Sequence, residues 1–340
     1  MSGRRPARFR LLGWAELGGR VLSPAEVEAM TRDAPERIPG LGGEFHLTWD
    51  GCTATDRLGI LGIPGPWGVI TCHGKSIGEV NPDVPLLSLG EAFSAAVRLR
   101  FDEGAVALSG GVDSALVASL AGLPCVTVGM AGSLDLEKGR AAAGALGLPW
   151  EGVAIARDEV EAALPQVIGA IPRATPLDVA VATGLFFVAR WAGGRGHSRI
   201  LVGQGADELF GGYARYRTAS DIPAMLVRDF ASLRGQALRD QAVARLHGTA
   251  FSLPYLDLRV VRAARALPPE GLVSPDTGKV PLREVAERLL PPVMARAPKK
   301  AMQYGSGIAG AIRDLARKNG YKRSVQGYIT QLSGERDGLA

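Results

Sequence analysis

A glycine-rich junction in the segment VALSGGVDSALVASL, residues 106–120, combines residue types that can hold a phosphate group. Small residues let backbone N–H groups converge on an anion, and the start of the following helix adds partial positive charge. A carboxylate here can hold a Mg²⁺ ion that bridges phosphates, and a hydroxyl can donate to a phosphate oxygen. A plain glycine-rich turn between a strand and a helix is the alternative. The expected site residues are Ser109, Gly110, Gly111, Asp113 for the metal and Ser114 for the hydroxyl.

A second segment, ILVGQGADELFGGYARY at residues 200–216, places two adjacent carboxylates after another apolar run. We expect Asp207 to make a second contact to Mg²⁺, since several phosphate charges need balancing. An acidic residue capping the start of a helix would give the same local pattern. Both segments together favour a nucleotide site.

The elements that must position these residues alternate between apolar β-branched runs and amphipathic segments from about residue 96 onward. Alternating strands and helices predict βαβ units and a parallel sheet, in which ligands bind beyond the carboxyl ends of the strands. After Tyr213 the pattern becomes mostly helical. We therefore expect an α/β fold with a helical C-terminal part, residues 96–340.

Residues 1–95 have a different character, rich in Gly, Pro and short apolar runs. The segment EFHLTWDG predicts a strand, and WGVITCHGKSIGEV predicts a hairpin. SPAEVEAMTRDA predicts a short helix with an N-cap serine and a proline at its first position. This region is expected to be a small β-rich unit.

Composition narrows the class of protein. The 340 residues carry a net charge of +5 with 6% aromatic residues, which suits anionic small ligands better than a nucleic-acid groove. Neither a long uncharged apolar run nor a signal peptide is apparent, so no membrane span and a cytoplasmic location are expected. The three cysteines, Cys52, Cys72 and Cys125, lack metal-ligand spacing, and we expect neither zinc nor a disulfide.

The first segment lacks the lysine of the Walker pattern. It resembles instead the pyrophosphate loop (PP-loop) of the ATP pyrophosphatases, of the adenine nucleotide α-hydrolase type. That resemblance implies that ATP is attacked at its α-phosphorus, so that an acceptor is adenylated and pyrophosphate is released.

With the second segment, the chain resembles the synthetase domain of the asparagine synthetase family over about residues 96–310. Further segments support this: VTVGMAGSLDLEKGRAAAGALGLPW, with Ser133 and Asp135 in the Gly-Ser-x-Asp turn, SLPYLDLRVVRAARALPPE, and GKVPLREVAERLLPPVMARAPKKAMQYGSG. The family adenylates the side-chain carboxylate of aspartate, and ammonia then displaces AMP.

The resemblance implies roles for individual residues. Leu108 and Val128 would bracket the adenine base, and Val202 and Gly203 would offer backbone groups to the adenylate. Ser109, Gly110, Gly111, Asp113 and Ser114 would cradle pyrophosphate. Asp113 and Asp207 would bind Mg²⁺, and Lys299 would stabilise the transferring phosphates.

The chain departs from the family at residues that bear on the acceptor. Gln204 stands where other members have Glu, and an amide cannot act as a base at neutral pH. Ala250 and Ser252 stand where the family often has Glu-x-Arg. These differences favour one alternative, an enzyme that amidates another carboxylate, closes a lactam or modifies a tRNA base. A non-catalytic ATP-binding subunit of an amidotransferase is the other alternative, and the intact SGGVDS and GADE segments and Lys299 argue against it.

The N-terminal region is about half as long as the glutaminase domain of glutamine-dependent members, and Ser2 replaces their nucleophilic Cys. LGGEFHLTWDGCTATDRLGI, residues 41–60, faintly resembles the last strands of that class II glutamine amidotransferase domain. We interpret residues 1–95 as a shortened relic of it, with Cys52 and Cys72 as small buried hydrophobes. Ammonia, free or from a separate glutaminase subunit, is then the expected nitrogen donor.

Overall fold

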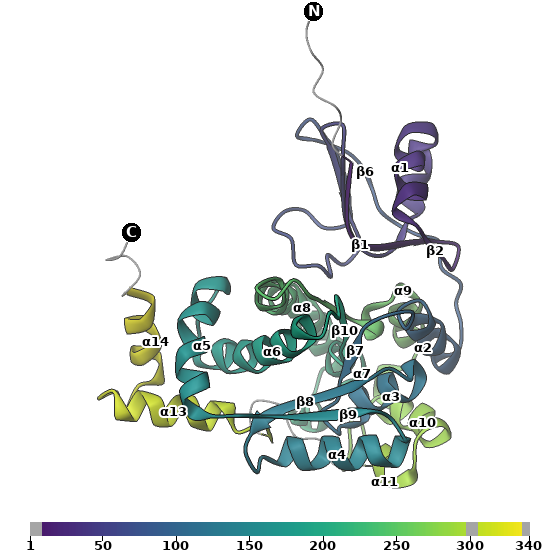
Figure 1. Cartoon of the computed structure of the whole chain (residues 1–340). Coiled ribbons are helices and arrows are strands. Elements are labelled where there is room, and N and C mark those ends of the chain that lie inside the picture. The colour runs from purple at the N-terminus through teal and green to yellow at the C-terminus, as the bar shows by residue number, and fades with distance from the viewer. Residues whose placement is uncertain (1–8, 297–304, 335–340) are drawn as a thin grey trace, which may run out of the picture.

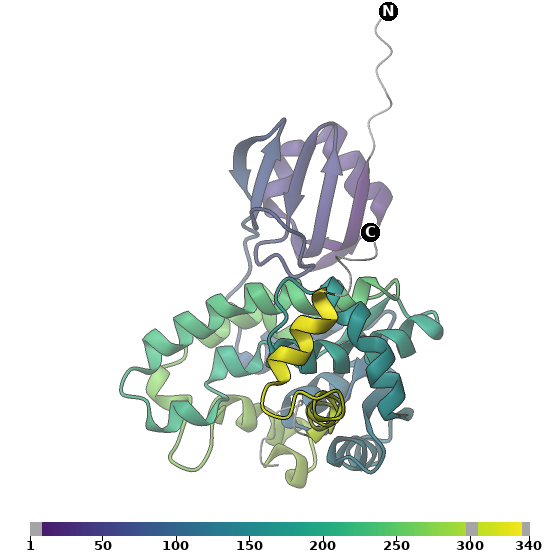
Figure 2. The same ribbon diagram turned by 90° about the vertical axis from the view of Figure 1, so that its left-hand side faces the viewer.

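The computed structural model describes residues 9–296 and 305–334. Two sheets organise the molecule: an antiparallel sheet between residues 10 and 79, and a parallel sheet between residues 105 and 252. Figures 1 and 2 show the antiparallel sheet at one end of the molecule, next to the larger helical and parallel-sheet part. The α/β class and the β-rich N-terminal region are therefore confirmed.

The antiparallel sheet has the order β2-β1-β3-β4-β5-β6. Phe45, Leu47 and Trp49 alternate along β3 and are buried under helix α1, together with Val27 from that helix. Helix α1 begins with a capping box, in which Ser23 and Glu26 satisfy each other's backbone N–H groups. The element bounds are β1 Arg10–Leu17, β2 Arg20–Leu22, α1 Pro24–Asp33, η1 Pro35–Gly40, β3 Gly42–Trp49, β4 Cys52–Thr55, β5 Val69–Cys72 and β6 Lys75–Glu79.

The expected strand, hairpin and short helix of this region are all present. One expectation was wrong: Cys52 and Cys72 form a disulfide and are only partly buried. Antiparallel pairing of β4 with β5 places the two residues opposite each other, with their Cα atoms 4.0 Å apart. A separation of 20 residues along the sequence gave no sign of this pairing. The third cysteine, Cys125, is a buried free thiol.

The parallel sheet has the order β11-β10-β7-β8-β9. Its strand β8 reads CVTVGM and is buried over almost its whole length, as expected for a strand covered on both faces. Helices α4 and α6 both contact β8. The bounds are α2 Leu89–Arg98, β7 Ala105–Ala107, α3 Val112–Ala121, β8 Cys125–Met130, α4 Leu134–Leu146, β9 Trp150–Ile155, α5 Arg157–Ala170, α6 Pro176–Gly194, β10 Arg199–Leu201 and β11 Ala250–Ser252.

Helices dominate the remainder of the described chain, as expected after Tyr213. Helix α6 is long and apolar enough to cross a membrane, but 72% of its apolar window is buried within the protein, where it contacts α5, α8 and α13. The bounds are α7 Ala206–Phe210, η2 Ala214–Thr218, α8 Ile222–Arg245, η3 Pro254–Leu256, α9 Leu258–Arg265, η4 Pro269–Gly271, α10 Val280–Leu289, α11 Pro292–Ala295, α13 Ile308–Lys318 and α14 Val325–Gly334.

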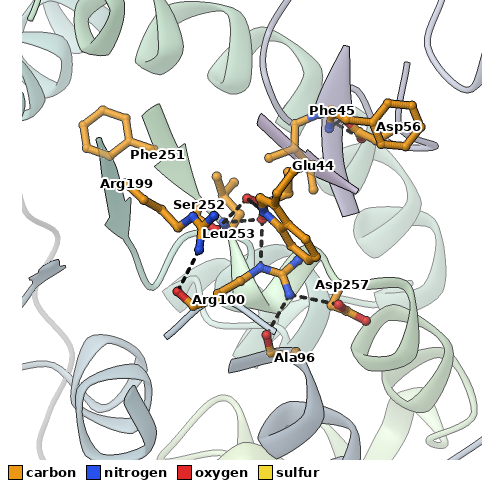
Figure 3. A network of polar contacts seen from close by, with 12 residues as sticks. Glu44, Phe45, Asp56, Ala96, Arg100, Arg199, Phe251, Ser252, Leu253 and Asp257 are labelled. Atoms are coloured by element: carbon orange, nitrogen blue, oxygen red, sulfur yellow. Dashed lines mark hydrogen bonds and ion pairs between the residues drawn. The ribbon is translucent and has the colours of Figure 1, made fainter. Parts of the chain in front are cut away.

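A buried network of charges joins the two parts of the molecule (Figure 3). Glu44 on β3 accepts hydrogen bonds from Arg100 Nε (2.9 Å), Ser252 Oγ (2.5 Å) and the backbone N–H of Leu253 (2.9 Å). Arg100 also donates to Asp257 Oδ2 at 2.9 Å. Arg100 and Glu44 are 1% and 2% exposed, so this ion pair is fully removed from solvent. The N-terminal sheet is thus tied to the segment that follows β11.

Candidate active site

The glycine-rich loop follows β7 and leads directly into α3. Gly110 has a φ of +75°, and a Cβ there would lie 2.7 Å from backbone atoms of Lys138, so only glycine fits. Ser114 Oγ accepts a hydrogen bond from the backbone N–H of Ser109 (3.1 Å) and donates to the carbonyl of Gly111 (3.2 Å). The Ser114 hydroxyl therefore closes the loop on itself and holds its shape ahead of the helix N-terminus.

The end of β10 lies against this loop. A Cβ at Gly203 would lie 2.9 Å from both the Cβ of Asp113 and the backbone N of Ser114, so glycine is required for this approach. The side chains of Leu108, Val128 and Val202 lie at the carboxyl ends of β7, β8 and β10, where they are 1%, 7% and 6% exposed. They belong mainly to the core. The contact of Leu108 and Val128 with a nucleobase, and that of the Val202 backbone with the adenylate, stay predictions.

Two carboxylates from separate elements converge on one ammonium group. Asp113 Oδ2, at the start of α3, lies 2.5 Å from Lys279 Nζ, and Asp207 Oδ1, at the start of α7, lies 2.6 Å from the same atom. Lys279 stands before α10 with a φ of +61° and is 3% exposed. Gly212 faces this group, and a Cβ there would collide with Asp207 and Lys279. The structure thus brings together the two acidic residues that the sequence singled out.

The charge of Lys279 is fixed by these neighbours. Burial alone lowers the pKa of Lys279, but the Asp113 and Asp207 carboxylates outweigh burial and raise its pKa above the usual value. Lys279 is therefore an ammonium ion at neutral pH. Sequence reasoning missed it, although it lies within the family-like segment GKVPLREVAERLLPP at residues 278–292. Only the tertiary fold brings it to Asp113, 166 residues earlier.

The same two carboxylates suit a magnesium ion. Mg²⁺ in nucleotide sites is commonly held by one or two carboxylates plus substrate phosphates. The Asp113 and Asp207 carboxylates already lie together around one cation, the Lys279 ammonium. Within residues 9–296 and 305–334, no group of three or more His, Cys, Asp and Glu residues could form a metal site without such phosphates. The donor set therefore fits an ion that arrives with a nucleotide.

Gln204 follows Gly203 and is partly exposed. Its amide nitrogen donates to Gln236 Oε1 (3.0 Å) and Asp240 Oδ2 (2.5 Å), both on α8. Behind them, Glu208 Oε1 accepts from Tyr213 Oη at 2.6 Å. Burial raises the pKa of Glu208, because its carboxyl is removed from solvent beside the charge of Asp207.

Two other sequence-predicted features lie at the ends of β8 and α4. Ser133 and Asp135 are buried at the start of α4, and a Cβ at Gly305 would collide with the Asp135 carboxylate. The backbone N–H of Met130 donates to the carbonyl of Ser306 at 2.8 Å, so the segment before α13 returns to the carboxyl end of β8. Lys299, the remaining expected site residue, lies outside the described residues.

A separate small pocket opens where the two parts of the molecule meet. Its lining includes Glu16, Asp56, Arg100 and Arg259, and does not include Asp113 or the other site residues named above. Arg100 and Arg259 pair with buried carboxylates. We interpret it as part of the domain interface, because Arg100 and Arg259 pair there with Asp257 and Glu16 from the same lining.

Comparison with known proteins agrees with this geometry. The family model described as asparagine synthase matches residues 88–224 and 217–331. A protein of Methanocaldococcus jannaschii, provisionally named a glutamine-hydrolyzing asparagine synthetase 1, is 31% identical over 284 residues, covering 70% of this chain and 52% of the relative. Glutamine-hydrolyzing asparagine synthetase 3 of Arabidopsis thaliana is 29% identical over 294 residues, covering 79% and 48%. That of Triphysaria versicolor is 31% identical over 228 residues, covering 59% and 39%.

The chain thus spans about half the length of these relatives, or less. The matched part contains the parallel sheet, the glycine-rich loop, both carboxylates and Lys279. Since the family model covers well over half of the 340 residues, the chain belongs to the asparagine synthase family.

Proposed function

We propose that this protein is an ATP-dependent ligase that forms an amide by way of an acyl-adenylate. The observation that supports this proposal is the convergence of Asp113, Asp207 and Lys279 beside a glycine-rich loop at the carboxyl ends of β7 and β10. A glycine-rich loop, a helix N-terminus and a buried ammonium together suit a triphosphate.

In the first half-reaction, a carboxylate oxygen attacks the α-phosphorus of ATP and the bond to the β-phosphate oxygen breaks. The loop formed by Ser109, Gly110 and Gly111 binds the departing pyrophosphate, and Lys279 offers it a positive charge. Asp113 and Asp207 would hold Mg²⁺, which neutralises phosphate charge when bound. The protein contributes positioning and electrostatic stabilisation, with no covalent intermediate on its own side chains.

In the second half-reaction, the lone pair of an ammonia nitrogen attacks the acyl carbon. The bond from that carbon to the phosphate oxygen breaks, and AMP leaves with the electron pair. The proton that nitrogen loses can be taken up by the AMP phosphate, since a phosphate monoester has a second pKa of about 6. The side chain of aspartate is the acceptor that family membership favours, which would make asparagine the product.

A second candidate keeps the adenylation step and changes the acceptor. Gln204 favours it, because an amide cannot serve as the base that a carboxylate at this position could supply. Another carboxylate, an internal amine that closes a lactam, or a tRNA base would then replace aspartate and ammonia. Ser252 gives less support to this candidate than the sequence suggested, because its hydroxyl is buried against Glu44 in the domain interface.

The nitrogen donor in this proposal is free ammonia or ammonia from a separate glutaminase subunit. The N-terminal sheet, in our proposal a shortened relic of a glutaminase domain, would then have kept its place in the fold without the hydrolytic site. Its buried contacts through Glu44 support a structural part for it in the present enzyme.

Pyrophosphate release across a panel of carboxylic acids, with ammonium or glutamine as donor, tests the function. We expect release with at least one acid, and amide formation with ammonium but not with glutamine alone. Asp113→Ala should lower the rate of pyrophosphate release by roughly 10²–10³-fold or more, because the carboxylate that would hold Mg²⁺ at the phosphates is gone. Lys299→Ala should slow adenylation and keep part of the ATP binding.

Ser119→Ala is a matched control on the same helix, since within the described part of the chain its hydroxyl donates only to the helix carbonyl of Leu116. Wild-type turnover by the Asp113 variant would overturn the site assignment. If ATP binds and no acid elicits pyrophosphate, the ligase proposal itself fails.

A further inference from the structure

A chain of hydrogen bonds connects Gln204 to side chains of α8 and to Glu208, and its donors and acceptors can be assigned in only one way. Glu208 Oε1 accepts from Gln236 Nε2 at 2.9 Å, and Gln236 Oε1 accepts from Gln204 Nε2 at 3.0 Å. Gln204 Nε2 also donates to Asp240 Oδ2 at 2.5 Å. Ser232, Gln236 and Asp240 are spaced four residues apart on α8, so they lie on one face of that helix.

The two ends of this chain determine the orientation of the Gln204 amide. A carboxylate only accepts hydrogen bonds, so the group that faces Asp240 must be the amide nitrogen. Gln236 uses both of its own N–H groups, toward Glu208 Oε1 and Ser232 Oγ (3.3 Å), so its oxygen must face Gln204. Both N–H groups of Gln204 therefore donate hydrogen bonds to side chains of α8.

The hydrogen bonds to α8 use the nitrogen of the Gln204 amide and leave its oxygen available to a ligand. Among the described residues, no hydrogen bond to Gln204 Oε1 is made. Gln204 follows Gly203, whose backbone touches Asp113 and Ser114, and it lies at the carboxyl edge of the sheet where ligands of this fold bind. A neutral acceptor thus lies beside the nucleotide loop.

The N-terminal part of the molecule holds α8 in place. A neighbouring row of side chains on this helix donates to backbone carbonyls of the loop after β4. Gln241 Nε2 donates to Ile60 at 3.0 Å, and Arg245 Nη1 donates to Leu61 at 2.9 Å. One row of α8 therefore fixes the helix to the N-terminal part, and the adjacent row fixes Gln204.

We propose that Gln204 Oε1 accepts a hydrogen bond from the nitrogen nucleophile, and that Gln236 and Asp240 are positioning residues for this acceptor. The proposal rests on the ligase function above and adds how the nucleophile is bound. A neutral amide oxygen orients an N–H group without taking its proton. The nucleophile therefore arrives as a neutral amine, and the proton that it sheds goes to the AMP phosphate.

Asp240→Asn tests the orientation directly. Arg239 Nε donates to the other oxygen of Asp240 at 2.7 Å and needs an acceptor, so the oxygen of the introduced amide should face Arg239. The NH₂ group of that amide then faces Gln204, whose own amide must turn its oxygen inward and present N–H groups to the site. We expect the ratio of amide formed to pyrophosphate released to fall at least tenfold.

Gln204→Glu gives the complementary test. A carboxylate at this position would face Asp240 and the oxygen of Gln236, all of them acceptors, so the single variant should lose several degrees of Tm. In Gln204→Glu with Asp240→Asn, the new carboxylate can accept from the NH₂ group of position 240. We expect the double variant to regain at least half of the lost Tm and to exceed both single variants in amide-to-pyrophosphate ratio.

Asp229→Asn is the matched control. Asp229 is another buried carboxylate on α8, paired with Arg215 and Tyr216 and without a bond to Gln204 or Gln236. It should lower Tm without changing the amide-to-pyrophosphate ratio. A merely structural role for Asp240 predicts the same behaviour for both variants.

Two outcomes overturn the proposal: a wild-type ratio in Asp240→Asn, or a double variant no more stable than Gln204→Glu. The Tm comparison uses the protein without substrates, so it decides the orientation even if no acceptor acid is found. Absence of pyrophosphate from the wild type, by contrast, counts against the ligase function and not against the hydrogen-bond chain.

Discussion

Lys279 shows how much of this site depends on one residue. Its ammonium group balances two carboxylates that come from different elements, and it is buried to 3% exposure. Two carboxylates this close repel each other, and partial burial removes some of the water that would solvate them, so a cation between them is stabilising. The lysine therefore helps to hold Asp113 and Asp207 close together.

Replacing this lysine removes the positive charge that lies between Asp113 and Asp207. Lys279→Met should lower the free energy of unfolding by about 3–5 kcal/mol, the usual cost when one partner of a buried ion pair is removed. Added Mg²⁺ should raise the Tm of this variant more than that of the wild type, because a cation that binds only the folded site stabilises it. Thermal melts with 0 and several millimolar Mg²⁺ measure both effects.

The double variant Lys279→Met with Asp207→Asn supplies the control. It removes one of the two opposing charges, so it should be more stable than Lys279→Met alone and respond less to Mg²⁺. Equal responses to Mg²⁺ in the wild type and both variants would show that these carboxylates do not form a cation site.

At the scale of elements, short sequence patterns predicted those helices, strands and turns whose formation depends on neighbouring residues. The glycine loop, the second acidic turn, the hairpin and the capped first helix each follow from residues within about ten positions. Lys279, Gln236 and Asp240 were beyond such reasoning, because their partners lie 32 to 166 residues away in the sequence. The disulfide between Cys52 and Cys72 was missed for the same reason: only the β4–β5 register reveals it.

The turn after β4 should make stability depend on pH. Asp56 accepts hydrogen bonds from the backbone N–H groups of Phe45, Leu58 and Ile60. Burial raises the pKa of Asp56 to about 7 from an ordinary value of 3.8, aided by the nearby Glu44 charge. The folded state therefore binds this proton more tightly than the unfolded chain does.

The sign follows from proton linkage. Between about pH 4 and 7 the folded state holds more protons, so the contribution of Asp56 to stability falls as pH rises and is constant above about 7. Asp56→Asn should be less stable at low pH, because it loses part of the acceptor capacity, but its deficit relative to the wild type should shrink as pH rises. Urea unfolding at pH 5, 6, 7 and 8 measures the difference, and a deficit that stays constant would contradict the assignment.

For the whole molecule, the buried interface decides whether the N-terminal sheet is an independent unit. Glu44 binds Arg100 and Ser252, and Arg259 binds Glu16 at 2.6 Å, so charges from both parts satisfy each other away from solvent. Separating the parts would leave these charges unpaired, which is costly in a buried site. The loop after β4 also contacts α8, the helix that holds Gln204. The N-terminal part thus supports both the interface and the helix behind Gln204.

We therefore expect the described chain to unfold in one cooperative transition, and Glu44→Gln to disrupt it. The amide keeps the shape of Glu44 but lacks its charge, so Arg100 loses a partner and the free energy of unfolding should fall by about 3–5 kcal/mol. Hydrogen exchange of segments from β3 and from α8, followed by mass spectrometry, should show the two protected together in the wild type and β3 exchanging earlier in the variant. Glu79→Gln is the matched control, because the Glu79–Arg57 pair is 66% and 40% exposed and should contribute at most about 1 kcal/mol. Independent exchange of the two segments in the wild type would mean that the N-terminal sheet folds alone and that the interface charges do not couple it to the site.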